Sequence, residues 1–394
     1  MFRFAFAFAL LAAPLSAQDI SAQIGANGLA ATETGLAALP APTASDRFAL
    51  GGVRFLRGVE RALQTRYRLG MAGKTMDVPV LRLDVAENPD AEPFYPAAIE
   101  EIFTALVADM ESAGAALEPI GEDDFGVVLD LADLWFDVNM SGARDPGEGV
   151  AEMAAGTVLP RRLGRDQAVL PKVRFDRADA DWLHAYTHLI AGLSNMVLAY
   201  PPAAAIEAVQ TAKGEIEIVK GDAPPVNALA HLFGDEADLA MMVYLALRQE
   251  PRAEHTRAAR QHFLTMITLN RGFWDRLAKE DDDNAEWIPN PAQTSALGLR
   301  MPPETGERWL AVLGDAEALL KGEKLMPHWQ FGGGAGINVQ RLLDEPSPVH
   351  LAEWVHGMGL LPYAEPGERI GIFNWRNFTR LVRGDSMLYV LLLN

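Results

Sequence analysis

The chain of 394 residues contains no cysteine. This absence excludes disulfide bonds, thiolate metal ligands and a cysteine nucleophile, and it also excludes a lipid anchor attached through cysteine. The stability of the fold must therefore come from the burial of apolar side chains, which make up 49% of the residues, and from any ion that the protein binds.

Positive charge is also scarce. The chain has 34 Lys and Arg residues against 53 Asp and Glu residues, which gives a formal net charge of −19. A field of this sign repels phosphate backbones and anionic lipid surfaces, and it attracts cations. The composition predicts no nucleic-acid partner and favours a protein that binds a positive ion.

Long apolar runs are absent apart from a short one at the start of the sequence. Met1 to Arg3 gives a positively charged beginning, an uninterrupted apolar run follows to Ala13, and Ala17 offers the small residue that a signal peptidase requires. The run is shorter than the roughly 20 residues of a membrane span. We expect residues 1–17 to be a cleaved signal peptide, and the mature chain, with a net charge of −20 after loss of Arg3, to be periplasmic or secreted without membrane contact.

Motifs of the common hydrolases are missing. The sequence has no GxSxG and no SxxK segment, and Ala185 stands after His184 where a HExxH metalloprotease carries its catalytic glutamate. A serine nucleophile and this type of zinc protease therefore have no support in the sequence.

The spacing of apolar residues predicts a mainly α, multi-helix globular protein with a few short strands. Two segments that alternate between apolar and polar residues, Val78–Val85 and Gly214–Asp222, are expected to be strands. Helices are expected at 48–69, Pro96–Leu117, Asp179–Tyr200, Asp235–Gln249, Ala253–Lys279, Pro303–Lys321 and Pro348–Met358. The expected division is a signal peptide at 1–17, an extended lead-in at 18–46, an N-terminal helical part at 47–160 and a C-terminal helical domain at 161–394.

One segment has the pattern of a calcium-binding loop. The twelve residues from Asp137 to Glu148 read DVNMSGARDPGE. Oxygen-bearing residues stand at positions 1, 3, 5, 9 and 12, and a glycine stands at position 6, where the chain must turn sharply. The residues at the ligand positions are Asp137, Asn139, Ser141, Ala143 (through its carbonyl oxygen), Asp145 and Glu148.

These twelve residues resemble the loop of the EF-hand family, and the resemblance is limited to them. It implies Ca²⁺ as a cofactor. Arg144 departs from the pattern, since paired EF-hands carry an apolar residue at that position, and the sequence holds no second loop. With three acidic ligands and a nearby arginine, we expect an affinity of about 10⁻⁴ to 10⁻³ M and a structural role for the ion.

Two further groups of residues are candidates for chemistry. His184 and His188 are four residues apart in an expected helix and so share one face, where together with His231 they form a candidate transition-metal site. The run from Glu280 to Glu286 contains five acidic residues next to Trp287. Such a group suits a carbohydrate-cleaving site or a second cation, and it is equally typical of a solvated loop.

The sequence leaves two functions open. In the first, the protein is an exported calcium-binding helical protein that serves as a binding or scaffold module for a protein or carbohydrate partner. In the second, it is an exported hydrolase, carbohydrate-directed or metal-dependent, whose acidic or histidine site rests on a calcium-stabilised scaffold.

Overall fold

The computed structural model of the chain describes residues 20–73, 78–154, 169–221, 229–298 and 301–381. Its architecture is mainly α-helical, as predicted, with a few short strands. The helices are α1 (Ile20–Ala37), α2 (Ala44–Arg68), α3 (Ala98–Leu117), α4 (Val150–Ala154), α5 (Arg177–Ala199), α6 (Ala203–Lys220), α7 (Leu229–Leu247), α8 (Ala253–Leu277), α9 (Thr305–Leu320), α10 (Val339–Asp344), α11 (Leu351–His356) and α12 (Phe373–Leu381). The strands are β1 (Val127–Asp130), β2 (Lys172–Phe175), β3 (Ala335–Ile337) and β4 (Ala364–Pro366).

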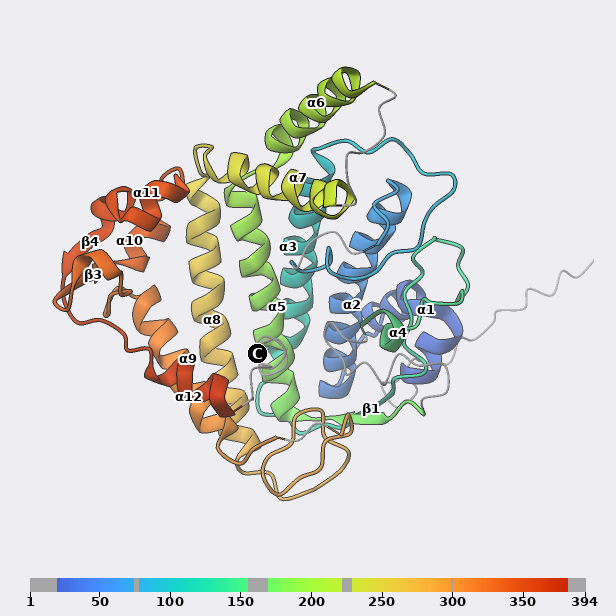
Figure 1. Cartoon of the computed structure of the whole chain (residues 1–394). Helices are drawn as coiled ribbons and strands as arrows, with labels where there is room; N and C mark the ends of the chain where they lie inside the picture. The colour runs from blue at the N-terminus through green and yellow to red at the C-terminus, as the bar shows by residue number, and fades with distance from the viewer. Residues whose placement is uncertain (1–19, 74–77, 155–168, 222–228, 299–300, 382–394) are drawn as a thin grey trace, which may run out of the picture.

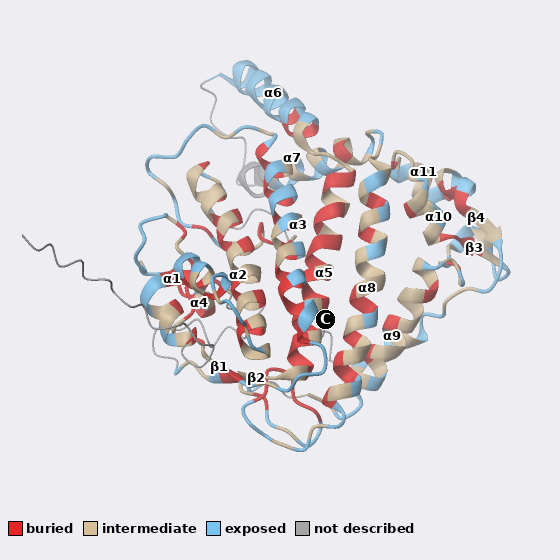
Figure 2. Cartoon of the chain, turned by 180° about the vertical axis from the view of Figure 1, so that it is seen from behind, coloured by how far each residue is buried: buried red, intermediate tan, exposed pale blue. Residues whose placement is uncertain are grey.

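Four long helices form the body of the molecule. Helices α2, α3, α5 and α8 lie side by side in that order (Figure 1), with α3 packed between α2 and α5, and α5 packed between α3 and α8. Helix α5 is buried along most of its length, whereas α6 projects from the body and is mostly exposed (Figure 2). The row of helices therefore places side chains of α3, α5 and α8 close to one another.

Two of these helices begin at capping boxes that the sequence encodes. Thr43 caps α2 and exchanges hydrogen bonds with Asp46, and Asp176 caps α5 and exchanges them with Asp179. Each box supplies partners for backbone N–H groups that the first turn of a helix leaves free. Helix α3 lacks such a box, and it is held by the burial of its apolar face, from Ile99 to Leu117.

The strands pair in two small antiparallel sheets, β1 with β2 and β3 with β4. In the first sheet Val127 lies opposite Phe175 and Asp130 lies opposite Lys172. The connection between β1 and β2 contains the Asp137–Glu148 segment and α4, and β2 leads directly into the cap of α5. This sheet positions both the connection that contains Asp137–Glu148 and the start of α5.

One continuous hydrophobic core joins most of the described chain. It extends from Ile20 in α1 to Phe378 in α12 and takes residues from both sides of the expected domain boundary after residue 160. A smaller cluster of Ile337, Leu360 and Tyr363 lies in the C-terminal part.

Most predicted helices are present, but three predicted segments differ. The expected extended lead-in contains helix α1, and Gly214–Asp222, expected to be a strand, belongs for the most part to α6. In α6 the apolar side chains of Ile216, Ile218 and Val219 are exposed. The alternation of apolar and polar residues in this segment therefore does not indicate a strand with one buried face. The third segment, Val78–Val85, forms turns rather than a strand.

The side chain of Arg66 explains the conformation of Val78–Val85. Its guanidinium is fully buried and donates to the carbonyl oxygens of Val80 (2.7 Å) and Leu83 (2.8 Å). It also donates to the carbonyl oxygens of Met71 and Gly73. Because these backbone carbonyl groups accept from the Arg66 side chain, they are not available for hydrogen bonds to a neighbouring strand. The segment Val78–Val85 therefore wraps around the end of α2.

None of the described helices alone has the length and apolar character of a membrane span. Helices α5 and α6 pass that test only as a pair, which is bent by 58°. The expected signal peptide, residues 1–17, lies outside the described residues.

Candidate functional site

The predicted calcium loop, Asp137–Glu148, is closed at its base by backbone hydrogen bonds. Trp135 and Gly149 form an antiparallel bridge, and the N–H of Phe136 donates to the carbonyl oxygen of Glu148 (2.9 Å). These bonds bring the two ends of the loop together, so that positions 1 and 12 lie next to each other.

Asp137 and Gly142 shape the interior of the loop. Gly142 has a φ of +76°, a conformation that glycine adopts without steric cost, and its N–H donates to Asp137 Oδ2 (3.1 Å). The other carboxylate oxygen, Asp137 Oδ1, is buried and has no hydrogen-bond partner among the described residues. A buried carboxylate oxygen in this condition costs free energy unless a cation or a donor satisfies it.

Glu148, at position 12, is buried at the base of the loop with 6% of its surface exposed. Its Oε1 accepts from the N–H of Val138 (2.9 Å), and its Oε2 accepts from the N–H of Asp145 (2.8 Å). Burial raises the pKa of Glu148 despite these hydrogen bonds. A nearby positive charge would therefore stabilise the ionised form.

The remaining predicted ligands are hydrogen-bonded to one another. Asn139 donates to Asp145 Oδ2 (2.6 Å), and Ser141 Oγ donates to the carbonyl oxygen of Ala143 (2.9 Å). The carboxylates of Asp137, Asp145 and Glu148 do not bring one oxygen each within 4.8 Å of the others. A calcium ion takes six to eight oxygens, so it would also need the oxygens of Asn139, Ser141 and Ala143.

Helix α2 holds the loop from outside, and helix α1 holds the segment just before it. Glu60 accepts from the N–H of Asp137 (2.7 Å), and Gln64 donates to the carbonyl oxygen of the same residue (2.8 Å). The indole of Trp135 donates to the carbonyl oxygen of Ile24 in α1 (2.8 Å). The loop is thus a junction between these two helices and the β1–β2 connection.

Arg144, the residue that departs from the EF-hand pattern, is turned toward the segment that precedes the loop. Its guanidinium donates to the carbonyl oxygen of Ala132. The guanidinium of Arg144 is therefore hydrogen-bonded to the backbone, although its positive charge remains close to the loop.

The histidines form a second candidate site, which differs from the predicted one. His184 and His188 lie on α5 with ring centroids 5.2 Å apart, and Nδ1 of His188 lies 2.8 Å from Nδ1 of His262 on α8. His231, predicted as the third member, belongs to α7, but its side chain lies outside the described residues. His262 was missed because no spacing in the sequence relates α8 to α5.

These three histidines line a cavity of about 410 Å³ between α3, α5 and α8. Its other polar lining residues are Glu111 and Glu118, both exposed, with Thr187 and Thr265. Burial lowers the pKa of all three imidazoles, and the charges of the two neighbouring rings help to lower that of His188 to about 4. The rings are therefore neutral near pH 7, the form in which imidazole binds metals.

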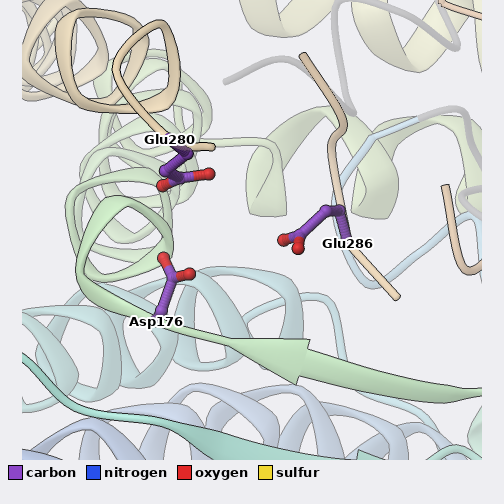
Figure 3. Close-up of side chains that lie close together, drawn as sticks. All are labelled: Asp176, Glu280 and Glu286. Atoms are coloured by element: carbon purple, nitrogen blue, oxygen red, sulfur yellow. The ribbon is translucent and has the colours of Figure 1, made fainter. Parts of the chain in front are cut away.

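Part of the acidic run comes together with a residue that the sequence did not suggest. One carboxylate oxygen each from Asp176, Glu280 and Glu286 lies within 4.8 Å of the others, and Figure 3 shows the three groups turned toward a common space. Burial, followed by the charge of Asp176, raises the pKa of Glu280 to about 7. These groups gather at the N-terminal end of α5, because Asp176 is its capping residue.

Asp282 and Asp283, two further residues of the acidic run, have hydrogen-bond partners elsewhere. Asp282 pairs with Arg174 (3.3 Å), and Asp283 accepts from the N–H and the hydroxyl of Thr294. Trp287, expected beside a carbohydrate site, is buried and packs against Phe175 and Trp182. It is a core residue, so it offers no exposed platform for a sugar ring.

A third feature is an almost wholly apolar cavity of about 220 Å³ between α2, α5 and the β1–β2 connection. Leu134 and Phe136, just before the calcium loop, and Val150 and Ala154, just after it, form part of its wall. The segments that carry the loop therefore also contribute to the core.

Comparison of the chain with protein-family models, with curated proteins and with solved structures gives no match.

Proposed function

We propose that this chain is an exported calcium-binding protein in which Ca²⁺ at Asp137–Glu148 stabilises the scaffold. The observation that carries the proposal is the carboxylate of Asp137. One of its oxygens accepts from the N–H of Gly142, while the other is buried without a hydrogen-bond partner in the described part of the chain. A hard cation inside the loop would satisfy that oxygen, and the excess of acidic residues favours a cation there.

The surroundings of the loop support a structural role for the ion. The backbone of Asp137 is fixed from α2 by Glu60 and Gln64, and Trp135 fixes α1 to the same segment. An ion that orders the loop would therefore hold α1 and α2 against the β1–β2 connection. The protein then acts as a scaffold or binding module of the periplasm or the extracellular space.

Thermal unfolding of the mature chain, residues 18–394, tests the proposal. The protein is measured in excess EDTA and at increasing CaCl₂, beside Glu148→Gln and a charge-matched control, Glu87→Gln, at an exposed position. An ion at 100 times its dissociation constant adds about 2.7 kcal/mol. In a protein of this size that raises the midpoint by roughly 5 °C, and a weaker site gives a smaller rise.

We expect the rise in the wild type and in Glu87→Gln but not in Glu148→Gln. Because Glu148 also accepts backbone hydrogen bonds, Asp145→Asn provides a second variant that leaves this residue intact. A midpoint that ignores Ca²⁺ in the wild type would overturn the proposal, as would a rise that survives in both loop variants.

A further inference from the structure

Three imidazoles from two neighbouring helices face the cavity between α3, α5 and α8. His188 and His262 approach each other through Nδ1 at 2.8 Å, and His184 lies one helical turn from His188. We propose that this cavity binds a transition-metal ion through the imidazoles of His184, His188 and His262. The site is separate from the calcium loop and does not depend on it.

The spacing of His188 and His262 suits a shared ion. Two nitrogens bound to one Zn²⁺ at 2.0–2.1 Å lie about 3 to 3.4 Å apart, close to the separation of the two Nδ1 atoms. With neutral rings, the Nδ1–H of one ring donates to the lone pair of the other Nδ1. If that proton moves to Nε2 of its own ring, both Nδ1 lone pairs are free to bind one metal ion.

His184 would complete the set only if its side chain reoriented. As they lie, the three rings do not bring one nitrogen each within 4.8 Å of the others. The ring of His184 lies against Gly114 of α3, where a Cβ atom would lie 3.2 Å from Nε2 of His184 and 3.3 Å from Oγ1 of Thr187. The absence of a side chain at Gly114 leaves room for this ring, which lines the cavity.

The carboxylates in the cavity wall favour a cation. The charge of Glu118 acts on His184, and that of Glu111 acts on His262. Both glutamates are exposed, so they can attract an ion without a large desolvation cost. A centre rich in imidazole nitrogen suits Cu²⁺, Zn²⁺ or Ni²⁺, whereas Ca²⁺ prefers sites made of oxygen.

Binding of Cu²⁺ to untagged, metal-free protein tests the proposal. The titration is made in saturating CaCl₂, which keeps the calcium loop occupied, and electron paramagnetic resonance reports the ligand atoms. We expect one equivalent of Cu²⁺ with hyperfine structure from imidazole nitrogens. His188→Gln and His262→Gln should each weaken binding roughly tenfold or more.

His255→Gln is the matched control, because His255 lies on the same helix as His262 and its Nδ1 contacts Oδ1 of Asn195 (2.8 Å) instead of the cavity. It should bind Cu²⁺ as the wild type does. Binding that is as tight in the His188→Gln/His262→Gln double variant as in the wild type would overturn the proposal. If the variants do not fold, as judged by circular dichroism, the wild-type spectrum decides: imidazole nitrogens support the site, and oxygen ligands alone contradict it.

Discussion

The ionised side chain of Glu280 destabilises the folded state. It is half-buried beside Asp176 and Glu286, and burial followed by the charge of Asp176 raises its pKa to about 7. The side chain of Gln293 donates to its Oε2 at 3.1 Å. The group therefore retains a proton in the folded state at pH values where it is ionised in the unfolded chain, which has a pKa near 4.5.

This difference predicts that Glu280 makes stability depend on pH. Because the folded-state pKa is raised, the folded chain binds more protons than the unfolded chain between about pH 4.5 and 7. The stabilising contribution is complete below pH 4.5 and is lost as the pH rises through 7. Glu280→Gln removes the charge, so we expect the variant to gain on the order of 2 kcal/mol over the wild type at pH 8, after allowance for solvent screening, and little at pH 4.5.

Urea unfolding in EDTA at several pH values between 4.5 and 8 measures this difference. Glu87→Gln, at an exposed position, should show a constant difference from the wild type across the range. If Glu280→Gln also shows a constant difference, the carboxylate has an ordinary pKa and the expectation is wrong.

Among the elements, those defined by local sequence are the ones that could be predicted. The apolar face of α3 recurs at three- and four-residue spacing, and the helix is found almost where expected. Alternation in Gly214–Asp222 was misleading, because an exposed helix tolerates apolar residues on its surface. Val78–Val85 was mispredicted because a side chain from another element, Arg66, determines its shape.

The same distinction between local sequence and tertiary packing applies to the candidate sites. The residues of the proposed calcium loop are contiguous, so a ligand spacing could be proposed from the sequence alone. His262 and Asp176 join their partners only through tertiary packing, and the nitrogens of His188 and His262 come from residues 74 positions apart. No local sequence pattern predicts contacts between residues on different helices. The i, i+4 spacing of His184 and His188 could be recognised because both lie on one helix.

The role of Arg66 at the end of α2 gives a prediction for that element. Arg66→Met keeps the apolar stem but leaves the carbonyl oxygens of Val80 and Leu83 without this donor. We expect a loss of about 3 to 5 kcal/mol in the free energy of unfolding, because buried carbonyl groups lose their partners. Urea unfolding at pH 7 measures it.

Arg68→Met is the matched control on the same helix. Arg68 is 37% exposed and pairs with exposed Glu92, so its replacement should cost less than about 1 kcal/mol. Equal losses in the two variants would show that the segment Val78–Val85 does not depend on the buried guanidinium.

In the whole molecule, the proposed calcium loop and the segment just before it join elements that are distant in the sequence. Ser21 of α1 donates to Asp133 (2.7 Å), Trp135 donates to the carbonyl oxygen of Ile24, and Glu60 of α2 accepts from Asp137. The loop is also continuous with the wall of the apolar cavity through Phe136. An ion in the loop should therefore act on the packing of α1 and α2, well beyond the twelve residues that bind it.

Hydrogen exchange followed by mass spectrometry tests this coupling in the wild-type protein. Addition of Ca²⁺ should slow amide exchange in the loop, in α1 and in the part of α2 near Glu60, because local opening of α1 breaks contacts with the segment that the ion orders. Helices α9 and α12 lie on the far side of α8 and should not change (Figure 1). Trp135→Phe removes the donor to Ile24, so it should keep protection in the loop and reduce it in α1. Protection confined to Asp137–Glu148 in the wild type would mean that the ion orders its own loop and does not hold the helices together.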